Sequence, residues 1–237
     1  MLPTRIVFTA FLVTLLVTAP DAQRATIKLV DVAADAGIDL VNVSGGAAKD
    51  YIVDANGNGA AFFDYDNDED LDVLIVNGST REHFAQGGDP MVALYQNDGS
   101  GHFRDVTAAS GFDRRGWGSG ACVGDIDNDG AKDVYITAFG ADALWGNTGK
   151  GTFVDITRAA GFDEKRWGTS CAFADYDHDG YLDLYVANYV AFDDKTIPAR
   201  GTWHSWRMRA VFPAGGSPRN RGARATTAWA TRQSDRQ

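Results

Sequence analysis

Short apolar runs alternate with polar segments rich in aspartate and glycine along most of the chain. The runs at 71–76, 134–139 and 182–187 are rich in Val, Ile, Leu and Tyr, and each follows an Asp-rich segment. Runs of this length bounded by turn residues predict β-strands rather than helices. Shorter strands of small residues are predicted at 121–124 and 172–174, directly before two of the Asp-rich segments.

The strand pattern repeats with an offset of 50 residues. The segment Leu94-Tyr-Gln-Asn-Asp-Gly-Ser-Gly-His-Phe-Arg-Asp-Val-Thr107 recurs as Leu144-Trp-Gly-Asn-Thr-Gly-Lys-Gly-Thr-Phe-Val-Asp-Ile-Thr157. Both copies predict a hairpin with a glycine-containing turn. An earlier unit has extra length, which indicates an insertion around 78–90. Units of about 50 residues with four antiparallel strands predict an all-β fold, a partial β-propeller of about three four-stranded blades.

Three smaller features accompany the repeats. The segment 29–32 matches the fourth strand of the later units but lacks the rest of a unit. Trp117 and Trp167 occupy equivalent positions and are predicted to pack between blades. Cys122 and Cys171 lie three and four residues before their Asp-rich segments, at opposite phases of equivalent strands. We therefore expect two separate buried thiols rather than a disulfide.

The three Asp-rich segments share one spacing, with aspartate at positions 1, 3, 5 and 9. These candidate metal ligands are Asp64, Asp66, Asp68 and Asp72; Asp125, Asp127, Asp129 and Asp133; and Asp175, Asp177, Asp179 and Asp183. Alternating carboxylates in a tightly curled loop form a flexible oxygen cage, which favours Ca²⁺ over Mg²⁺ or zinc. A strand follows each loop and position 12 is aliphatic, so these segments are not EF-hands. Glu69 replaces the glycine of the other loops, so we expect the first site to be weaker or distorted.

Charge divides the chain into an acidic body and a basic tail. The 237 residues have a formal net charge of −10, but residues 23–199 hold a net −17 and residues 200–237 a net +7. Such an acidic body repels nucleic acids and anionic membranes unless cations neutralise it. The tail has no strand or helix pattern, and we expect 200–237 to be disordered. A shifted reading frame or truncated gene is the favoured explanation, and a basic docking tail is the alternative.

The N-terminus has the layout of a secretory signal peptide. Arg5 precedes an apolar run at 6–17, and small residues follow up to position 22. The run is too short to span a hydrocarbon core of ~30 Å comfortably. We therefore expect residues 1–22 to be a signal peptide and the mature protein to be secreted, periplasmic or on the cell surface.

The motifs resemble a known family. The succession Phe-x-Asp-Val-Thr, Trp-Gly, D-x-D-x-D-G-x-x-D and an aliphatic strand resembles FG-GAP/VCBS repeats, which form the calcium-binding blades of integrin α-subunit propellers. The run from Trp167 to Tyr189 is similar to secreted proteins related to cartilage acidic protein, which often carry an ASPIC/UnbV module.

The resemblance covers residues 26–197. It implies a calcium-stabilised propeller used in extracellular binding or adhesion without catalysis, with the twelve loop aspartates as ligands. The implied partner is an extracellular protein or glycan. The alternative is a fragment of a propeller enzyme that acts on polysaccharides, although no partnered catalytic pair stands at a readable spacing in the sequence.

Overall fold

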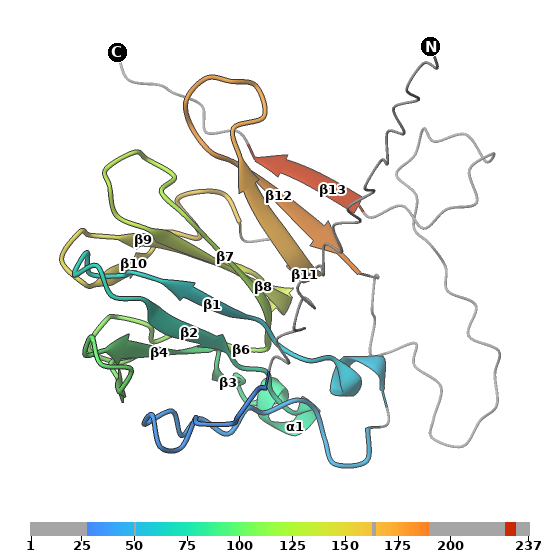
Figure 1. Cartoon of the computed structure of the whole chain (residues 1–237). Coiled ribbons are helices and arrows are strands. Elements are labelled where there is room, and N and C mark those ends of the chain that lie inside the picture. The colour runs from blue at the N-terminus through green and yellow to red at the C-terminus, as the bar shows by residue number, and fades with distance from the viewer. Residues whose placement is uncertain (1–27, 50, 163–164, 190–225, 231–237) are drawn as a thin grey trace, which may run out of the picture. The chain divides into compact units, whose positions relative to one another are not determined.

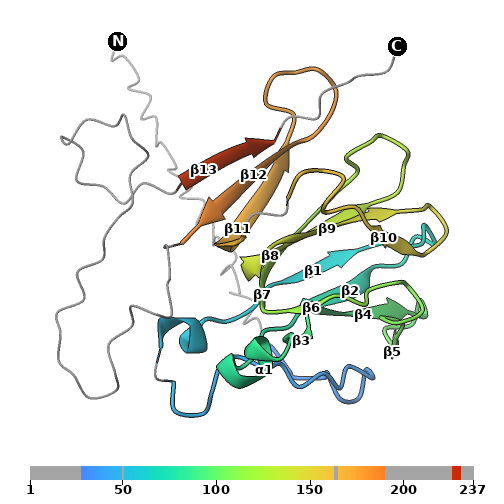
Figure 2. The same cartoon turned by 180° about the vertical axis from the view of Figure 1, so that it is seen from behind.

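Two antiparallel sets of four strands form the first two blades. The computed structural model describes residues 28–49, 51–162, 165–189 and 226–230. The first sheet has the order β1 (Ala60–Phe63), β2 (Asp72–Val76), β4 (Val92–Asn97) and β5 (Phe103–Asp105). The second has β7 (Gly118–Gly124), β8 (Asp133–Ala141), β9 (Ala143–Asn147) and β10 (Phe153–Asp155) in the equivalent order (Figures 1 and 2). The predicted all-β fold, with propeller-like blades of four strands, is confirmed in these two repeats.

The third sheet differs from the first two. Its strands β11 (Lys165–Ala174) and β12 (Asp183–Asn188) pair as β7 and β8 do. The strand β11 also pairs antiparallel with β8, which joins the second and third blades in one seven-stranded sheet. The position that β4 and β9 hold in the first two blades, next to the second strand, is occupied by β13 (Thr226–Ala230), which pairs antiparallel with β12 (Figure 1). The register is equivalent in all three sheets, because Val73 pairs with Tyr95, Val134 with Trp145 and Leu184 with Ala230.

The strand β13 corrects one expectation about the tail. Residues 200–237 were predicted to be disordered, and this prediction is wrong for Thr226–Ala230. The sequence pattern failed here because a single strand of five residues obtains its order from its partner and not from its own periodicity. The rest of the tail and the predicted signal peptide at 1–22 lie outside the described residues.

The insertion predicted in the first repeat is present between β2 and β4. It contains the short helix α1 (Arg81–Ala85), which begins after Thr80, whose hydroxyl accepts a hydrogen bond from the backbone N–H of His83. The strand β3 (Asp89–Pro90) follows and pairs with β6 (Arg115–Gly116). A single turn of 3-10 helix, η1 (Ile52–Ala55), precedes the first blade.

A compact turn links each blade to the next. After β5, the N–H of Ser110 donates to Val106 O, and the carbonyl of Ser110 accepts from the N–H of Phe153 in the next blade. The same turn precedes the first blade, where Ala36 accepts from the N–H of Phe103. Residues 28–32 match the fourth strands in sequence but form no strand, and the turn that follows them is the part of the repeat that the structure shows.

Apolar residues fill the spaces between neighbouring blades. One buried cluster joins the first and second blades and includes Leu74, Val76, Leu94, Ile136 and Trp145. A second joins the second and third blades and includes Tyr135, Leu144, Leu184 and Val186. Burial of side chains of this size contributes about 1.5–3 kcal/mol each, so packing between blades is the main stabilising term.

The two repeated tryptophans lie in a third cluster, as predicted. Trp117 and Trp167 are 2% and 3% exposed. Phe139 lies between them and makes an edge-on ring contact with each. An aromatic side chain from each repeat thus connects the second blade with the third.

The cysteines correct the second expectation. Cys122 on β7 and Cys171 on β11 form a disulfide between the second and third blades. The prediction of two separate thiols was wrong because it assumed that cysteines at opposite phases of equivalent strands cannot meet. Neighbouring blades pack face to face, so a residue pointing forward from one blade meets a residue pointing backward from the next. Opposite phases are therefore what such a bond requires.

Candidate metal centres

Each Asp-rich segment folds into the same loop between the first and second strands of its blade. In the first loop, Asp64 accepts hydrogen bonds from the N–H groups of Asp68 (3.1 Å) and Glu69 (2.9 Å). The same pair of bonds runs from Asp129 and Gly130 to Asp125, and from Asp179 and Gly180 to Asp175. The first aspartate of each loop thus curls the following backbone around its own carboxylate.

The ninth aspartate closes each loop from the other side. Asp72 accepts from the N–H of Tyr65 at 3.1 Å, as Asp133 does from Ile126 and Asp183 from Tyr176. Since the ninth aspartate begins the second strand of each blade, the strand fixes its position. The loop geometry therefore follows from aspartate spacing that recurs three times.

The fold brings three carboxylates together in every loop. The first, third and ninth aspartates each offer an oxygen, and within a loop these atoms all lie within 4.8 Å of one another. The three groups are Asp64, Asp66 and Asp72; Asp125, Asp127 and Asp133; and Asp175, Asp177 and Asp183. Three carboxylate oxygens at this separation are a hard donor set suited to a divalent cation.

The fifth aspartates lie outside these groups of three. The carboxylates of Asp68, Asp129 and Asp179 accept hydrogen bonds from the backbone N–H two residues further on. Each fifth aspartate therefore shapes its loop in this structure, and its predicted role as a ligand stays a prediction.

The first loop is not distorted by Glu69, and the other expectation from sequence, a weaker site, stays a prediction. Its hydrogen bonds match those of the other loops. Glu69 adopts a φ of 73°, whereas Gly130 and Gly180 at the same position have φ values of 91° and 89°. The left-handed backbone is sterically unfavourable for glutamate, so the substitution affects the stability of the loop and not its shape.

The carboxylates are charged groups held close together and partly out of water. Burial raises the pKa of Asp72 to about 6, and the neighbouring Asp66 and Asp68 add to that rise. Burial, followed by the charge of Asp68, raises the pKa of Asp66 as well. Burial likewise raises the pKa of Asp133. In the first and second clusters the rise in pKa thus comes first from burial, and neighbouring carboxylates add to it.

One oxygen in the first cluster is suited to a ligand that the chain does not supply. Asp66 Oδ1 is buried and has no hydrogen-bond partner among the described residues, while Asp66 Oδ2 accepts from the side chain of Gln96 at 2.7 Å. A buried carboxylate oxygen without a partner is costly. The donor set and this oxygen fit a bound calcium ion, which would be held by Asp64, Asp66 and Asp72.

Two asparagines that were not assigned a role fasten the loops to the hairpins. The side-chain amide of Asn97 donates to the carbonyl of Leu71, and that of Asn147 donates to the carbonyl of Lys132. Both acceptors are the eighth residue of a loop. The recurrence of asparagine 50 residues apart was the signal that could have found this contact.

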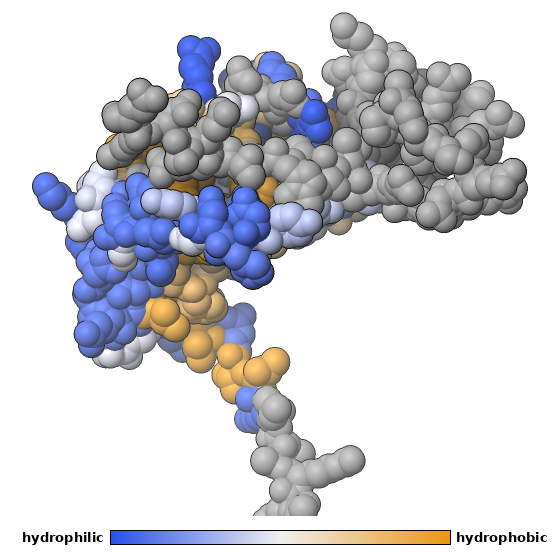
Figure 3. All heavy atoms as spheres, turned by 90° about the horizontal axis from the view of Figure 1, so that it is seen from above, coloured by the Kyte–Doolittle hydropathy of each residue, from blue (hydrophilic) through white to orange (hydrophobic). Residues whose placement is uncertain are grey.

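The loop side of the molecule is polar. In Figure 1 the first two loops lie toward the left and the loop between β11 and β12 lies at the top, and the view from above shows many hydrophilic residues on the left (Figure 3). In the described ranges, no helix is long and apolar enough to cross a membrane.

Comparison with known proteins gives one family. A model of the FG-GAP-like repeat matches residues 64–136 and again residues 125–186, which together make up more than half of the chain. No curated protein matches the chain. The finer similarity to cartilage acidic protein and the ASPIC/UnbV module gains no support from these matches. Both matches begin on the first aspartate of a loop and end within a second strand, and the chain belongs to the FG-GAP-like repeat family.

Proposed function

We propose that the chain is a secreted, calcium-binding propeller module with a non-catalytic role in extracellular interaction or adhesion. The observation that carries the proposal is the set of three carboxylate clusters. Each is built by the same loop, and in each the three carboxylate oxygens lie within 4.8 Å of one another. Calcium accepts six to eight oxygen ligands in flexible geometry, and backbone carbonyls and water would complete each shell.

The disulfide supports an extracellular location. Disulfides form and persist in oxidising compartments, and they are rare in the cytosol. The bond between Cys122 and Cys171 therefore fits an exported protein. Extracellular calcium modules typically have a Kd of about 10⁻⁴–10⁻³ M, which suits loops on the surface of a scaffold.

The three sites should differ in affinity. Asp72 and Asp133 are 0% and 3% exposed, whereas Asp183 in the third loop is only partly buried. The backbone N–H groups of Asn97 and Asn147 also hold Asp72 and Asp133 at 2.8 Å. A ligand that is held in place loses less conformational freedom on binding, so we expect the third loop to bind calcium most weakly.

Thermal unfolding of the full chain tests the calcium sites. The melting temperature is measured by circular dichroism in calcium, in EGTA and in magnesium, and calorimetric titration gives the number of ions bound. A calcium concentration ten times the Kd stabilises the fold by about 1.4 kcal/mol per site. We expect calcium to raise the melting temperature by several degrees and magnesium to have a smaller effect.

Two matched variants assign the effect to the loops. Asp127→Asn removes a third-position carboxylate, and its side chain is exposed. Asp113→Asn removes an exposed carboxylate outside the loops. Asp127→Asn should reduce the rise caused by calcium and the number of ions bound, and Asp113→Asn should change neither. Equal melting temperatures in calcium and EGTA would refute the calcium assignment.

A further inference from the structure

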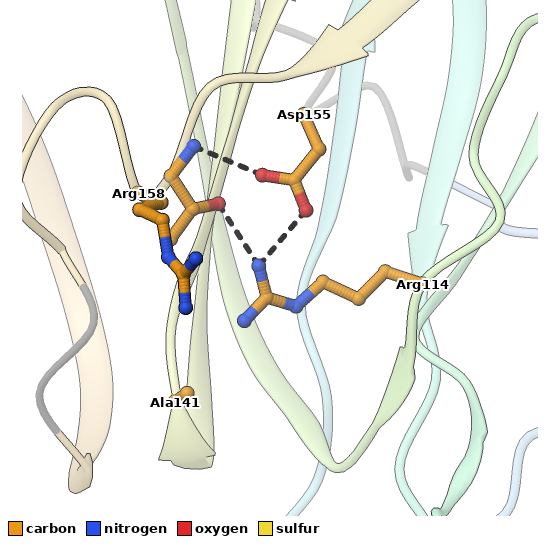
Figure 4. Close-up of a pocket in the computed structure, with 5 residues that line it drawn as sticks. Arg114, Ala141, Asp155 and Arg158 are labelled. Carbon is orange, nitrogen blue, oxygen red and sulfur yellow. Dashed lines mark hydrogen bonds and ion pairs between the residues drawn. The ribbon is translucent and has the colours of Figure 1, made fainter.

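A cavity lies at the end of the second blade that is remote from its acidic loop. Its volume is about 430 Å³, and its lining residues are Arg114, Ala141, Asp155, Thr157 and Arg158 (Figure 4). The strand β8 begins with the loop residue Asp133 and ends with Ala141 at the cavity. The length of one strand therefore separates the cavity from the metal centre of the same blade.

One arginine of the cavity is held firmly in place. Nη1 of Arg114 donates to Asp155 Oδ2 at 3.0 Å and to Thr157 Oγ1 at 2.9 Å. Both bonds use the same nitrogen, so the remaining donors of the guanidinium stay directed away from this pair of acceptors. A guanidinium fixed in this way is preorganised for a further planar anion.

The second arginine gives the cavity a positive charge. The guanidinium of Arg158 lies on the cavity side of its segment, toward that of Arg114 (Figure 4). In the part of the chain that the structure describes, the only carboxylate lining the cavity is Asp155. With two guanidinium groups and one carboxylate, the lining residues carry a net positive charge in an otherwise acidic body. Such a site attracts anions, and guanidinium groups bind carboxylates and sulfates with paired hydrogen bonds.

Comparison of the two blades shows which residues of this cavity belong to the repeat and which occur in the second blade alone. Asp155 accepts from the N–H of Thr157 at 2.9 Å, and Thr157 Oγ1 accepts from a backbone N–H of β9. The first blade contains the same arrangement, in which Asp105 accepts from the N–H of Thr107 at 2.8 Å and Thr107 accepts from β4. The aspartate and threonine are therefore required by the blade itself.

The arginines have no counterpart in the first blade. The residue after Thr107 is Ala108, where the second blade has Arg158. Arg114 follows the second turn by two residues, and Leu40 stands at the same distance after the first turn. Because a complete blade forms without either arginine, the fold does not account for their presence. A binding function accounts for both.

The dimensions and lining of the cavity indicate the rest of the ligand. A volume of about 430 Å³ lies within the range of roughly 300–1,000 Å³ for small-molecule sites, and it far exceeds the need of a lone carboxylate. The described lining offers a threonine, charged groups and one alanine, without an aromatic or large apolar side chain. A hydroxylated ring, which presents both polar and apolar groups, would suit this mixed lining.

We propose that this cavity binds one acidic sugar unit of an extracellular polysaccharide, with its carboxylate or sulfate held between Arg114 and Arg158. This inference rests on the proposed extracellular interaction role, and it names the chemistry of the partner. The anionic group supplies the charge contact, and the sugar ring fills the remaining volume beside Thr157.

Calorimetric titration of the full chain in calcium buffer tests the proposal with four probes. These are a uronic acid oligosaccharide, a sulfated oligosaccharide, a neutral oligosaccharide of equal length and hexaglutamate. At least one acidic oligosaccharide should bind at least tenfold more tightly than the neutral one and hexaglutamate, and the stronger of the two identifies the anionic group. Equal binding of hexaglutamate, or no binding of either acidic oligosaccharide at millimolar concentration, would overturn the proposal.

Variants connect the binding to the cavity. Arg158→Gln removes one charge from the lining, and Arg104→Gln removes an exposed charge on β5 of the first blade. Loss of one charge-assisted contact should weaken binding about tenfold for Arg158→Gln, and Arg104→Gln should bind as the unaltered chain does. Unaltered affinity in Arg158→Gln would contradict the assignment. Melting in calcium and EGTA shows separately whether each variant is folded and whether the calcium sites are intact.

Discussion

The sixth position of the first loop allows a sharp test of how much a left-handed backbone conformation reduces the stability of these loops. Glu69 has a φ of 73° and its counterpart Gly130 a φ of 91°. A left-handed backbone costs a residue with a side chain about 1–2 kcal/mol. Glycine loses about 0.5–1 kcal/mol more than other residues through the entropy of the unfolded chain. The net gain expected for Glu69→Gly is therefore about 0.5–1 kcal/mol.

The reverse change should have the opposite sign. A Cβ placed on Gly130 meets no other atom within 4 Å, so Gly130→Ala tests the backbone without a steric clash. We expect this variant to lose about 0.5–1 kcal/mol. For a domain of this size 1 kcal/mol corresponds to roughly 2–4 °C in melting temperature, which scanning calorimetry resolves.

The charge of Glu69 requires its own control. Glu69 lies among five aspartates of the first loop, so its removal also relieves repulsion when calcium is absent. Glu69→Gln removes the charge and keeps the backbone conformation, and the difference between it and Glu69→Gly isolates the backbone effect. Equal stability of these two variants in saturating calcium, together with a neutral Gly130→Ala, would refute the reasoning.

Three further predictions concern residues outside the metal clusters. Burial raises the pKa of Asp142 to about 6, so the stability from its protonated form is complete below about pH 4 and is lost as the pH rises through 6. The parent should therefore lose up to about 3 kcal/mol of its free energy of unfolding between pH 4 and 7 through this group, and Asp142→Asn should lack that loss. Urea unfolding across this pH range measures both proteins, and the same pH dependence in both would contradict the prediction. The double variant Cys122→Ser with Cys171→Ser should lower the free energy of unfolding by about 4 kcal/mol in oxidising buffer and have no effect under reduction, because the bond spans 49 positions. Gly37→Ala places a Cβ 2.5 Å from the carbonyl oxygen of Phe103 at a φ of +88°. It should destabilise the chain by about 2–3 kcal/mol, and a stability equal to that of the parent would show that this turn does not fasten the first blade.

The strands and loops could be predicted because their signals are local and occur more than once. The spacing of Asp125, Asp127 and Asp133 defines a loop, and its recurrence at Asp175 fixes the length of a repeat. Each strand is short and is bounded by turn residues. Local patterning is therefore sufficient to place the elements and to bring the candidate ligands together.

The remaining features depend on contacts between distant parts of the chain. The disulfide depends on which faces of β7 and β11 meet, and β13 depends on a free edge of β12. The cavity joins Arg114 to Thr157, which are 43 positions apart and lie in the segments between blades. Neither arginine recurs in another repeat. Comparison of the repeats with one another therefore does not identify either arginine as a candidate site residue.

The separation of the two proposed sites leads to a last prediction. The aspartates recur in every blade at the start of the second strand, whereas the arginines occur once and lie at the far end of β8. Calcium should therefore control stability, and the arginines should control binding. Asp127→Asn should lower the melting temperature in calcium while the affinity for the acidic oligosaccharide at 10 °C stays within about twofold of the parent, since the fold remains intact there.

Arg158→Gln should show the converse, with about tenfold weaker binding and an unchanged melting temperature. An exposed arginine outside the core contributes little to stability, so its loss should affect the ligand alone. If Asp127→Asn weakened binding as strongly as Arg158→Gln at this temperature, the loop and the cavity would be energetically coupled along β8. The shared strand would then transmit calcium binding to the cavity, and the independence of the two ends of the blade would be refuted.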